Sequence, residues 1–345
     1  MAQEAELNFI DDGAAGITRK RIGNKTSPVT RWAYYDTDGR RIADRDEIER
    51  LNAIALPPAY EQAWFCPDPD GHLLATGIDA RGRKQYRYHP RFRAERDCLK
   101  FDSLARFGLA LPAIRKRVEQ DIAMRGLVRE RAVASVVRLL DTAGIRVGNE
   151  AYAKANKSFG ATTLRRRHAQ LAGQSLRLRF RAKSGKMQDV RLSDRALARF
   201  VRAVQDLPGQ NLFQFLDAAG DPSPVGSADI NGYIQETLGD DFTAKQFRTW
   251  HASAAAFEVL AESRDHVPMR DLLEEVSGRL GNTPAIARKS YIHPALLALA
   301  ADKAAQQAFR DGLRLPRRSR WLSRPERGLL AFLAACPGSA ELLAA

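Results

Sequence analysis

The chain has 345 residues, 44% of them hydrophobic and 28% charged, a composition that excludes disordered and fibrous proteins and is long enough for two domains. The 55 Lys and Arg residues outnumber the 41 Asp and Glu residues, and the resulting net charge of +14 favours a polyanionic partner, most often nucleic acid. No apolar stretch approaches the roughly 18 residues that span a bilayer, and the N-terminus lacks a signal-peptide pattern, so the sequence predicts a cytoplasmic protein with no membrane contact.

The first 95 residues predict a small, turn-rich β domain. They hold 15 basic and 15 acidic residues, so the whole net charge of +14 arises after residue 95. Short apolar or aromatic stretches between Arg31 and Tyr88 are separated by Asp-Gly turns, at residues 36–39, 68–71 and 79–82. Asp and Gly favour the positive φ angles of hairpin turns. We therefore expect a mostly antiparallel sheet with one helix from about Asp44 to Ala53.

A local cationic stretch closes this domain. Residues 81–93 carry six basic residues and no acidic one, and Gln85, Tyr86 and Tyr88 lie between the charges. Glutamine pairs with base edges in the major groove, and tyrosine contacts phosphates or thymine methyl groups. The same pattern also fits an ordinary solvated strand. The residues that we expect to face DNA are Arg81, Arg83, Lys84, Gln85, Tyr86, Arg87 and Tyr88.

Residues 96–345 predict a second, mainly helical domain. Apolar residues recur at helical spacing behind Pro112, which favours a helix that begins near this proline, and before Gly144, which ends another. Further helices are expected after a cap at Ser193 and over about 227–238, 243–263, 269–280 and 294–311. The sequence therefore predicts an α+β protein with domains 1–95 and 96–345.

One β-hairpin interrupts the predicted helices. Leu176, Leu178 and Phe180 alternate with arginines, residues 183–185 provide a Lys-Ser-Gly turn, and the alternation resumes at Val190. The pattern predicts a hairpin that carries Lys183 at its tip.

Motifs for nucleotide and metal chemistry are absent from the sequence. It contains no Walker loop, no Gly-x-Gly-x-x-Gly and no His-Glu-x-x-His, and its three cysteines are too far apart for a Cys-x-x-Cys site. We therefore expect no cofactor, no metal site and no small-molecule substrate.

Five residues instead stand in distinctive local contexts. Arg146 follows a helix-ending glycine, Lys183 occupies the hairpin tip, and Arg248 lies on a helix whose other residues are mostly apolar or small. A guanidinium offers a planar fork to phosphate oxygens, and a lysine is able to donate a proton to a leaving group. Each residue alone also has a structural explanation: a surface arginine, a turn lysine, a salt-bridged arginine, a helix-capping residue at Asn282 and a half-buried core residue at Tyr291.

Taken in order, these residues and their neighbours resemble the type IB DNA topoisomerases, in particular the compact bacterial proteins similar to the poxvirus enzyme. The resemblance extends over nearly the whole chain and rests on residues 82–88, 139–149, 180–186, 245–249 and 280–284 with 289–291. It implies a monomer that clamps duplex DNA between a β-rich N-terminal domain and a catalytic domain, at the nucleoid. It also implies that supercoils are relaxed without ATP or metal, by cleavage of one strand through a 3′-phosphotyrosyl intermediate.

The resemblance implies roles for individual residues. Tyr291 is the nucleophile, Arg146 and Arg248 neutralise the non-bridging oxygens, Lys183 protonates the departing 5′-oxygen, and Lys245 matches a further basic position. The family usually has histidine where this chain has Asn282. Because the amide of asparagine neither gains nor loses a proton at neutral pH, it does no acid–base work. We therefore expect Asn282 to act by donating a hydrogen bond to a phosphate oxygen.

Two other interpretations remain open. A tyrosine recombinase has the same Arg, Lys, Arg and Tyr chemistry on a related fold, but its usual motif has histidine three residues before the second arginine, where this chain has Lys245. A non-catalytic basic protein would bind nucleic acid by neutralising phosphates, which needs no particular tyrosine. A covalent protein–DNA adduct that depends on Tyr291 distinguishes catalysis from mere binding.

Overall fold

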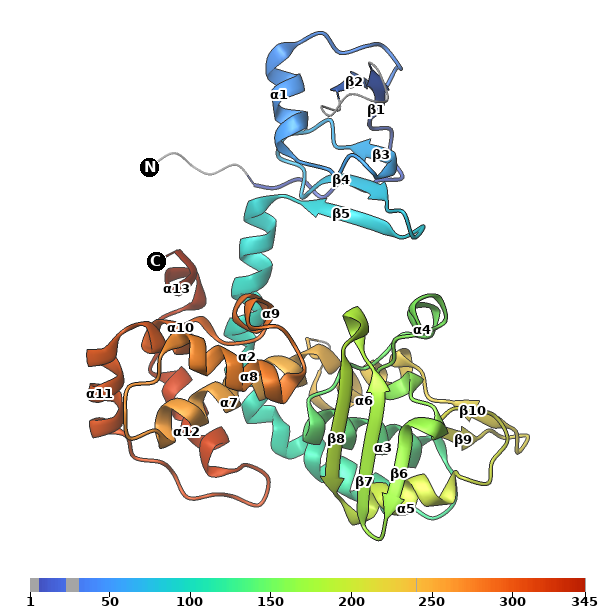
Figure 1. Ribbon diagram of the computed structural model, residues 1–345, viewed down its shortest axis with the longest axis vertical. Helices are drawn as coiled ribbons and strands as arrows, with labels where there is room; N and C mark the ends of the chain where they lie inside the picture. The colour runs from blue at the N-terminus through green and yellow to red at the C-terminus, as the bar shows by residue number, and fades with distance from the viewer. Residues whose placement is uncertain (1–5, 23–30, 240, 345) are drawn as a thin grey trace. The chain divides into compact units, whose positions relative to one another are not determined.

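The computed structural model describes residues 6–22, 31–239 and 241–344 (Figure 1). The chain divides into two compact units, residues 1–99 and 100–345, and the division falls within the long helix α2 (Pro90–Ile122). The antiparallel sheet of unit 1 and the many helices of unit 2 confirm the α+β prediction. No helix among the described residues is long and apolar enough to cross a membrane.

Unit 1 is built on a five-stranded antiparallel sheet. A small apolar core joins the sheet to helix α1 (Arg45–Ala53). The carboxylate of Asp44 caps this helix by accepting a hydrogen bond from the amide of Asp46 at 3.0 Å. The strands, in the spatial order β2-β1-β3-β4-β5, are β1 (Ile17–Ile22), β2 (Arg31–Tyr35), β3 (Glu61–Phe65), β4 (Leu73–Ile78) and β5 (Lys84–Tyr88).

The side chains of the edge strand β5, which is part of the cationic stretch, lie on two opposite faces of the sheet. Lys84, Tyr86 and Tyr88 are exposed on one face, where the two tyrosine rings stack with centroids 5.9 Å apart. Gln85 points to the opposite face, because side chains alternate along a strand, and its amide donates to Asp79 Oδ2 at 3.0 Å. The strand therefore separates Gln85 from the two tyrosines.

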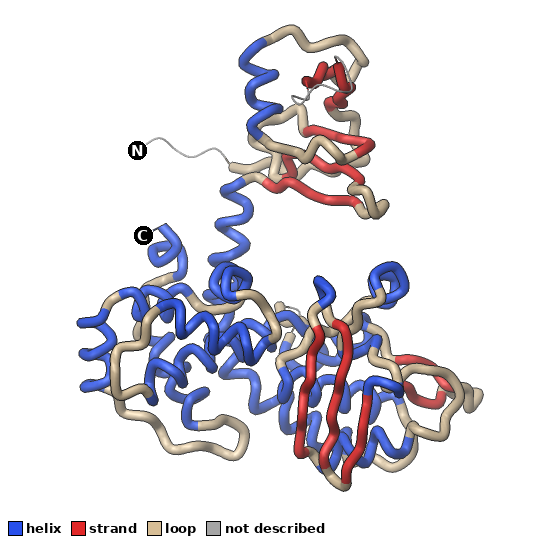
Figure 2. Tube along the Cα trace, viewed as in Figure 1, coloured by secondary structure: helices blue, strands red, loops and turns tan. Residues whose placement is uncertain are grey.

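Unit 2 combines a three-stranded antiparallel sheet with a larger set of helices (Figure 2). The strands β6 (Ala169–Ala172), β7 (Ser175–Arg181) and β8 (Met187–Ser193) lie side by side in this order. Helices α3 (Arg129–Ala143) and α5 (Arg195–Ala203) pack against them. The other elements are α4 (Glu150–Asn156), β9 (Gln214–Leu216), β10 (Pro222–Pro224), α6 (Ser227–Leu238), α7 (Ala244–Glu262), α8 (Met269–Leu280), α9 (Pro284–Ser290), α10 (Pro294–Ala301), α11 (Lys303–Gly312), α12 (Arg324–Ala334) and α13 (Ser339–Ala344), with short 3-10 turns at Ala161–Thr163, Arg166–His168 and Lys183–Gly185.

The start of α2 differs from the expectation. The helix begins at Pro90, and Pro112 lies inside it, where a proline forgoes one backbone hydrogen bond and normally breaks the helix. Leu111 and Ile114, on either side of the proline, are both buried in the core of unit 2. Packing of the apolar face thus outweighs the local cost of Pro112.

Three further expectations are corrected by the structure. Asp194, not Ser193, caps α5, because its carboxylate accepts the amides of Ala196 and Leu197. The helix expected over 294–311 is divided at Asp302, whose carboxylate caps α11. The expected hairpin is β7 and β8, but β6 extends it to three strands, and β9 and β10 form a separate pair.

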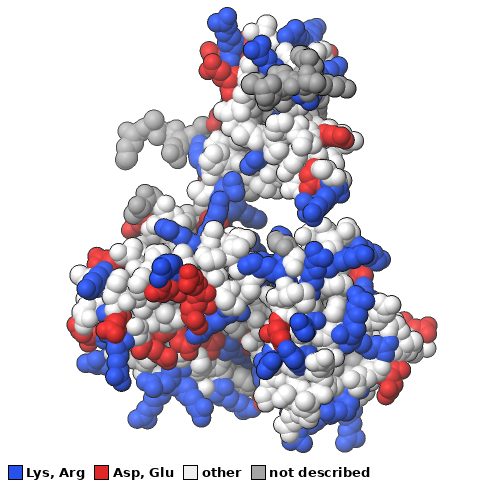
Figure 3. All heavy atoms as spheres, viewed as in Figure 1, with Lys and Arg blue, Asp and Glu red and all other residues white. Residues whose placement is uncertain are grey.

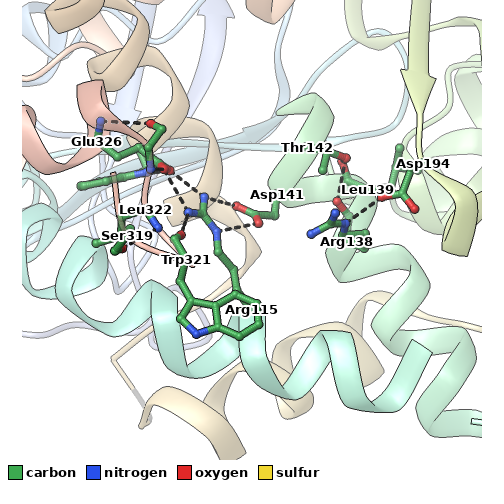
Figure 4. A network of polar contacts seen from close by, with 12 residues as sticks. Arg115, Arg138, Leu139, Asp141, Thr142, Asp194, Ser319, Trp321, Leu322 and Glu326 are labelled. Carbon is green, nitrogen blue, oxygen red and sulfur yellow. Dashed lines mark hydrogen bonds and ion pairs between the residues drawn. The ribbon is translucent and has the colours of Figure 1, made fainter. Parts of the chain in front are cut away.

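A buried ion cluster joins α2, α3 and α12 (Figure 4). The guanidinium of Arg115 contacts both oxygens of Asp141 at 2.8 Å and those of Glu326 at 2.6 and 3.0 Å. The indole of Trp250 donates to Glu326 Oε1 at 3.0 Å. Because Asp141 lies in the last turn of α3, the cluster also holds the end of the helix that precedes Arg146.

We expect Glu326→Gln to destabilise the protein in a pH-dependent way. Burial alone would raise the pKa of Glu326, but Arg115 and Trp250 lower the pKa from 4.5 to about 2. A carboxyl group whose pKa is lowered by folding contributes stability above its unfolded pKa and loses this contribution as the pH falls through the folded pKa. The shift corresponds to about 3 kcal/mol. The deficit in the free energy of unfolding should therefore be of this order at neutral pH and should shrink as the pH falls from about 5 toward 2.

Urea unfolding followed by circular dichroism at several pH values measures this deficit. Glu119→Gln is the control, because Glu119 forms an exposed ion pair with Arg320 at 2.9 Å, and such pairs contribute less than about 1 kcal/mol. A deficit for Glu326→Gln that does not change as the pH is lowered would contradict the role of the cluster.

Candidate active site

Unit 2 contains a pocket of about 480 Å³ that brings together five of the six residues predicted for the catalytic site, all except Asn282. Arg146, Lys183, Lys245, Arg248 and Tyr291 all line it, although they come from four separate segments. The described residues include no group of three or more His, Cys, Asp or Glu side chains placed to bind a metal ion. The rest of the lining consists of Val147, Gly148, Asn149, Tyr152, Ser158, Phe159, Gly160 and Ala244.

Arg146 is half-buried on the loop between α3 and α4. The amide of Ala161 donates to the carbonyl of Arg146 at 2.8 Å, and the amide of Thr162 donates to the carbonyl of Val147 at 2.7 Å. This close approach requires glycine at position 160, because a Cβ there would lie 2.6 Å from the Arg146 carbonyl oxygen. The neighbouring turn thus fixes the backbone of Arg146 at the pocket.

Arg248 is a buried cation, with only 3% of its surface exposed. Its guanidinium donates to the carbonyl of Gly144, to the carbonyl of Leu280 at 3.3 Å and to Asn282 Oδ1 at 2.8 Å. In the part of the chain that the structure describes, no carboxylate forms an ion pair with it, which contradicts the salt-bridge explanation. Burial, and after it the charge of Arg146, lowers the pKa of Arg248. A buried cation without a counter-ion favours an anionic ligand.

Asn282 connects the two arginines. Its Oδ1 accepts hydrogen bonds from Arg146 Nη2 at 3.0 Å and from Arg248 Nη2 at 2.8 Å, whereas its Nδ2 is buried without a partner. Gly281 before it has a φ of +65°, and a Cβ at this position would lie 2.1 Å from the amide nitrogen of Gln188. Asn282 therefore accepts hydrogen bonds from both guanidiniums, and its Nδ2 group is still able to donate one.

Tyr291 is half-buried at the C-terminal end of α9. Ser253 on α7 donates to the carbonyl of Tyr291 at 3.2 Å and accepts from the amide of His293 at 3.0 Å, which ties the segment to α7. The Arg248 Cζ atom lies 4.9 Å from the centre of the tyrosine ring. Burial raises the pKa of the phenol, but the charges and hydrogen bonds of Arg248 and Arg146 outweigh burial and lower the pKa below its usual value. The two arginines therefore make the phenolate, which is the nucleophilic form, easier to form than at an ordinary tyrosine.

The two lysines of the pocket are exposed at the ends of regular elements. Lys183 begins the 3-10 turn at the tip of the β7–β8 hairpin, as the sequence predicts, and Lys245 lies in the first turn of α7. An exposed amine at a hairpin tip suits proton transfer to a leaving group that arrives with the substrate. Lys and Arg side chains gather over this hairpin tip and α4 (Figure 3), which makes the surface around the pocket attractive to a polyanion.

Two contacts between the hairpin and the turn after α8 were not predicted. Lys186 Nζ donates to the carbonyl of Asn282 at 2.7 Å, and Gln188 Nε2 donates to the carbonyl of Leu280 at 3.2 Å. Gln188 occupies an inward position of the β8 alternation and is 8% exposed. A polar residue at a core-facing position is the signal that identifies Gln188, whereas no feature of the sequence points to Lys186.

Family profiles match both units of the chain. The profile described as eukaryotic DNA topoisomerase I, catalytic core, matches residues 89–306, which is more than half of the chain. The profile described as bacterial DNA topoisomerase IB, N-terminal domain, matches residues 31–79.

Two viral proteins are similar to this chain over most of its length. DNA topoisomerase 1B of Acanthamoeba polyphaga mimivirus is 29% identical over 291 residues, which cover 80% of this chain and 85% of that protein. DNA topoisomerase 1B of vaccinia virus (strain Copenhagen) is 21% identical over 269 residues, which cover 75% of this chain and 84% of that protein. A solved structure of the XerH site-specific recombinase bound to its difH substrate aligns with 55% of this chain and 52% of that chain, with a TM-score of 0.35 and 16% identity.

Proposed function

The chain belongs to the type IB DNA topoisomerase family, and we propose that the pocket of unit 2 is where it cleaves and rejoins one strand of supercoiled duplex DNA. The observation that carries this proposal is the convergence of Arg146, Lys183, Arg248 and Tyr291 on one pocket. Cleavage passes through a 3′-phosphotyrosyl intermediate. Because the covalent ester conserves the energy of the broken bond, religation needs no ATP.

Each step of cleavage has a residue in the pocket. Tyr291 attacks the phosphorus as the phenolate, after its proton has passed to solvent, and forms the new P–O bond, while the bond from phosphorus to the 5′-oxygen breaks. Negative charge on the non-bridging oxygens is neutralised by Arg146 and Arg248, which are already held in place and need no reorganisation. Lys183 gives its proton to the departing 5′-oxygen, which leaves as a hydroxyl group. Religation reverses these steps, and Lys183 takes the proton back.

Asn282 and Lys245 complete the proposed site. The Oδ1 atom of Asn282 orients both guanidiniums, and its unpartnered Nδ2 is the atom that donates to a phosphate oxygen. Lys245 adds a further positive charge at the exposed edge of the pocket.

Relaxation of supercoiled plasmid in EDTA, without ATP, tests the proposed function directly. Positive and negative supercoils should both be relaxed, because the arginines supply the charge that a metal ion would otherwise provide. Duplex affinity should fall steeply as salt rises, since the net charge of +14 lies after residue 95. An absolute requirement for a divalent cation, or an affinity that does not depend on salt, would contradict this function.

Unit 1 is proposed to form the other half of a clamp around DNA, in a protein that acts as a monomer at the nucleoid. The exposed face of β5 supports this role, because Tyr86 and Tyr88 offer two stacked rings to the duplex. Lys84 on the same face is paired with Asp12 at 2.5 Å and would have to exchange this partner for a phosphate. Arg81, Arg83 and Arg87 belong to the same basic stretch, although Arg83 is paired with Asp79 at 2.7 Å and Arg87 donates to the carbonyl of Ala55 at 3.0 Å.

Simultaneous replacement of Gln85, Tyr86 and Tyr88 by alanine should weaken duplex binding by about tenfold or more, because both tyrosines lose their contacts and a hydrogen bond to a charged phosphate oxygen is worth roughly 1.5–3 kcal/mol. Fluorescence anisotropy with a labelled duplex measures the affinity, and circular dichroism checks the fold. Restoring Gln85 alone should recover little of the affinity, because its amide already contacts Asp79. An unchanged affinity of the triple variant would remove β5 from the DNA interface.

A further inference from the structure

We propose that Lys186 and Gln188 are positioning residues that hold the Lys183 hairpin against the turn formed by residues 280–282. The proposal rests on the function proposed above, because it concerns how the proton donor is kept at the pocket. It gives a role in the reaction to two side chains that do not line the pocket.

Both side chains end on the same turn: Lys186 lies immediately before β8, and Gln188 lies within it. Lys186 Nζ lies 2.7 Å from the carbonyl oxygen of Asn282, and Gln188 Nε2 lies 3.2 Å from that of Leu280. The amide of Ala182 donates to the carbonyl of Lys186 at 2.7 Å and closes the hairpin tip. Lys183 therefore lies in the loop between Ala182 and Lys186, and the side chain of Lys186 attaches this loop to Asn282.

The fit of Gln188 to the turn is specific. Gln188 is buried, and its amide nitrogen occupies the space that a Cβ at Gly281 would fill, at 2.1 Å. On the other strand of the hairpin, the amide of Phe159 donates to the carbonyl of Arg181 at 2.8 Å. The tip is thus attached on both sides, through β7 to residue 159 and through β8 to the turn.

The turn itself is held independently of the hairpin. The amides of Gly281 and Asn282 donate to the carbonyls of Gly278 and Ser277 at 3.3 and 3.0 Å, which continues the end of α8. The same turn supplies the acceptors that hold Arg248. Loss of Lys186 should therefore release the hairpin tip and leave the two arginines in place, so that the defect acts through Lys183.

Single-turnover cleavage at saturating protein tests this assignment, because saturation removes effects on DNA affinity. Lys186→Met should slow cleavage of an ordinary phosphodiester by about 10- to 100-fold, the range expected for a lost hydrogen bond to a charged group. On a strand whose 5′-bridging oxygen is replaced by sulfur, which leaves without a proton, most of the rate should return. The double variant with Lys183→Ala should be no slower than Lys183→Ala alone.

Two further variants separate positioning from proton donation. Lys186→Arg should retain most of the rate, because a guanidinium also donates to a carbonyl but gives up no proton at neutral pH. Met187→Ala is the matched control at the next position of the chain, since Met187 is 62% exposed, and its rate should not change.

Three results would overturn the positioning role: an unchanged rate for Lys186→Met, equal defects on both substrates, or additive defects in the double variant. A Lys186→Arg variant as slow as Lys183→Ala would make Lys186 itself the donor and would also overturn it. If the wild-type protein forms no covalent adduct at all, the failure lies instead with the proposed function.

Discussion

Replacement of Tyr291 by phenylalanine should abolish the covalent protein–DNA adduct while the fold and the DNA affinity persist. Phenylalanine lacks the oxygen that attacks phosphorus, and no other group in the reaction replaces it. The contacts that place the segment are made by the backbone, because Ser253 donates to the carbonyl of Tyr291. Denaturing gel electrophoresis after incubation with a nicked suicide duplex measures the adduct, and fluorescence anisotropy measures DNA affinity.

Tyr152 is the matched control for this experiment, because it is a second tyrosine in the lining of the same pocket. Tyr152→Phe should still form the adduct, whereas Tyr291→Phe should not, with either an oxygen or a sulfur leaving group. The reverse pattern would move the nucleophile to Tyr152, and an adduct with both variants would place it outside the pocket.

Local signals in the sequence predict those elements whose ends depend on their own residues. Gly281 ends α8 in a left-handed conformation, and Thr283 with Pro284 begins α9, as expected. The hairpin tip at Lys183 follows from alternation and a turn. Such features need no knowledge of distant parts of the chain.

Elements that depend on tertiary packing are predicted less well. Pro112 is a helix-starting signal by itself, but it lies within α2 because Leu111 and Ile114 are buried against the rest of unit 2. Asp302 divides the helix expected over 294–311, and its carboxylate accepts the first amides of α11. Neither outcome follows from periodicity alone.

In the candidate site, the sequence predicts the functional side chains but not the contacts that hold them. The order of the motifs predicts which side chains meet, and Arg146, Lys183, Arg248 and Tyr291 do line one pocket. The groups that hold them are mostly backbone carbonyls, which every residue carries and no sequence pattern marks. The acceptor role of Asn282 towards both arginines likewise depends on contacts between residues far apart in the chain.

Changing the leaving group from oxygen to sulfur should separate the role of Lys183 from that of the arginines. Lys183→Ala should slow cleavage of an ordinary phosphodiester by about 10² to 10⁴, the usual contribution of general acid catalysis. The fold should survive, because Lys183 is exposed at a hairpin tip. On a strand with sulfur in place of the 5′-bridging oxygen, protonation of the leaving group is hardly needed, so the variant should regain most of its rate.

Arg146→Ala and Arg248→Ala should remain slow on the sulfur substrate, because the charge that they neutralise lies on the non-bridging oxygens of both substrates. Arg248→Ala should be the more severe of the two, since Arg248 is buried and its guanidinium also lies 4.9 Å from the centre of the Tyr291 ring. Rapid-quench measurement of single-turnover cleavage gives each rate on both substrates. If Lys183→Ala were equally slow on oxygen and sulfur, Lys183 would not be the proton donor, and Lys186 or Lys245 would become the candidate.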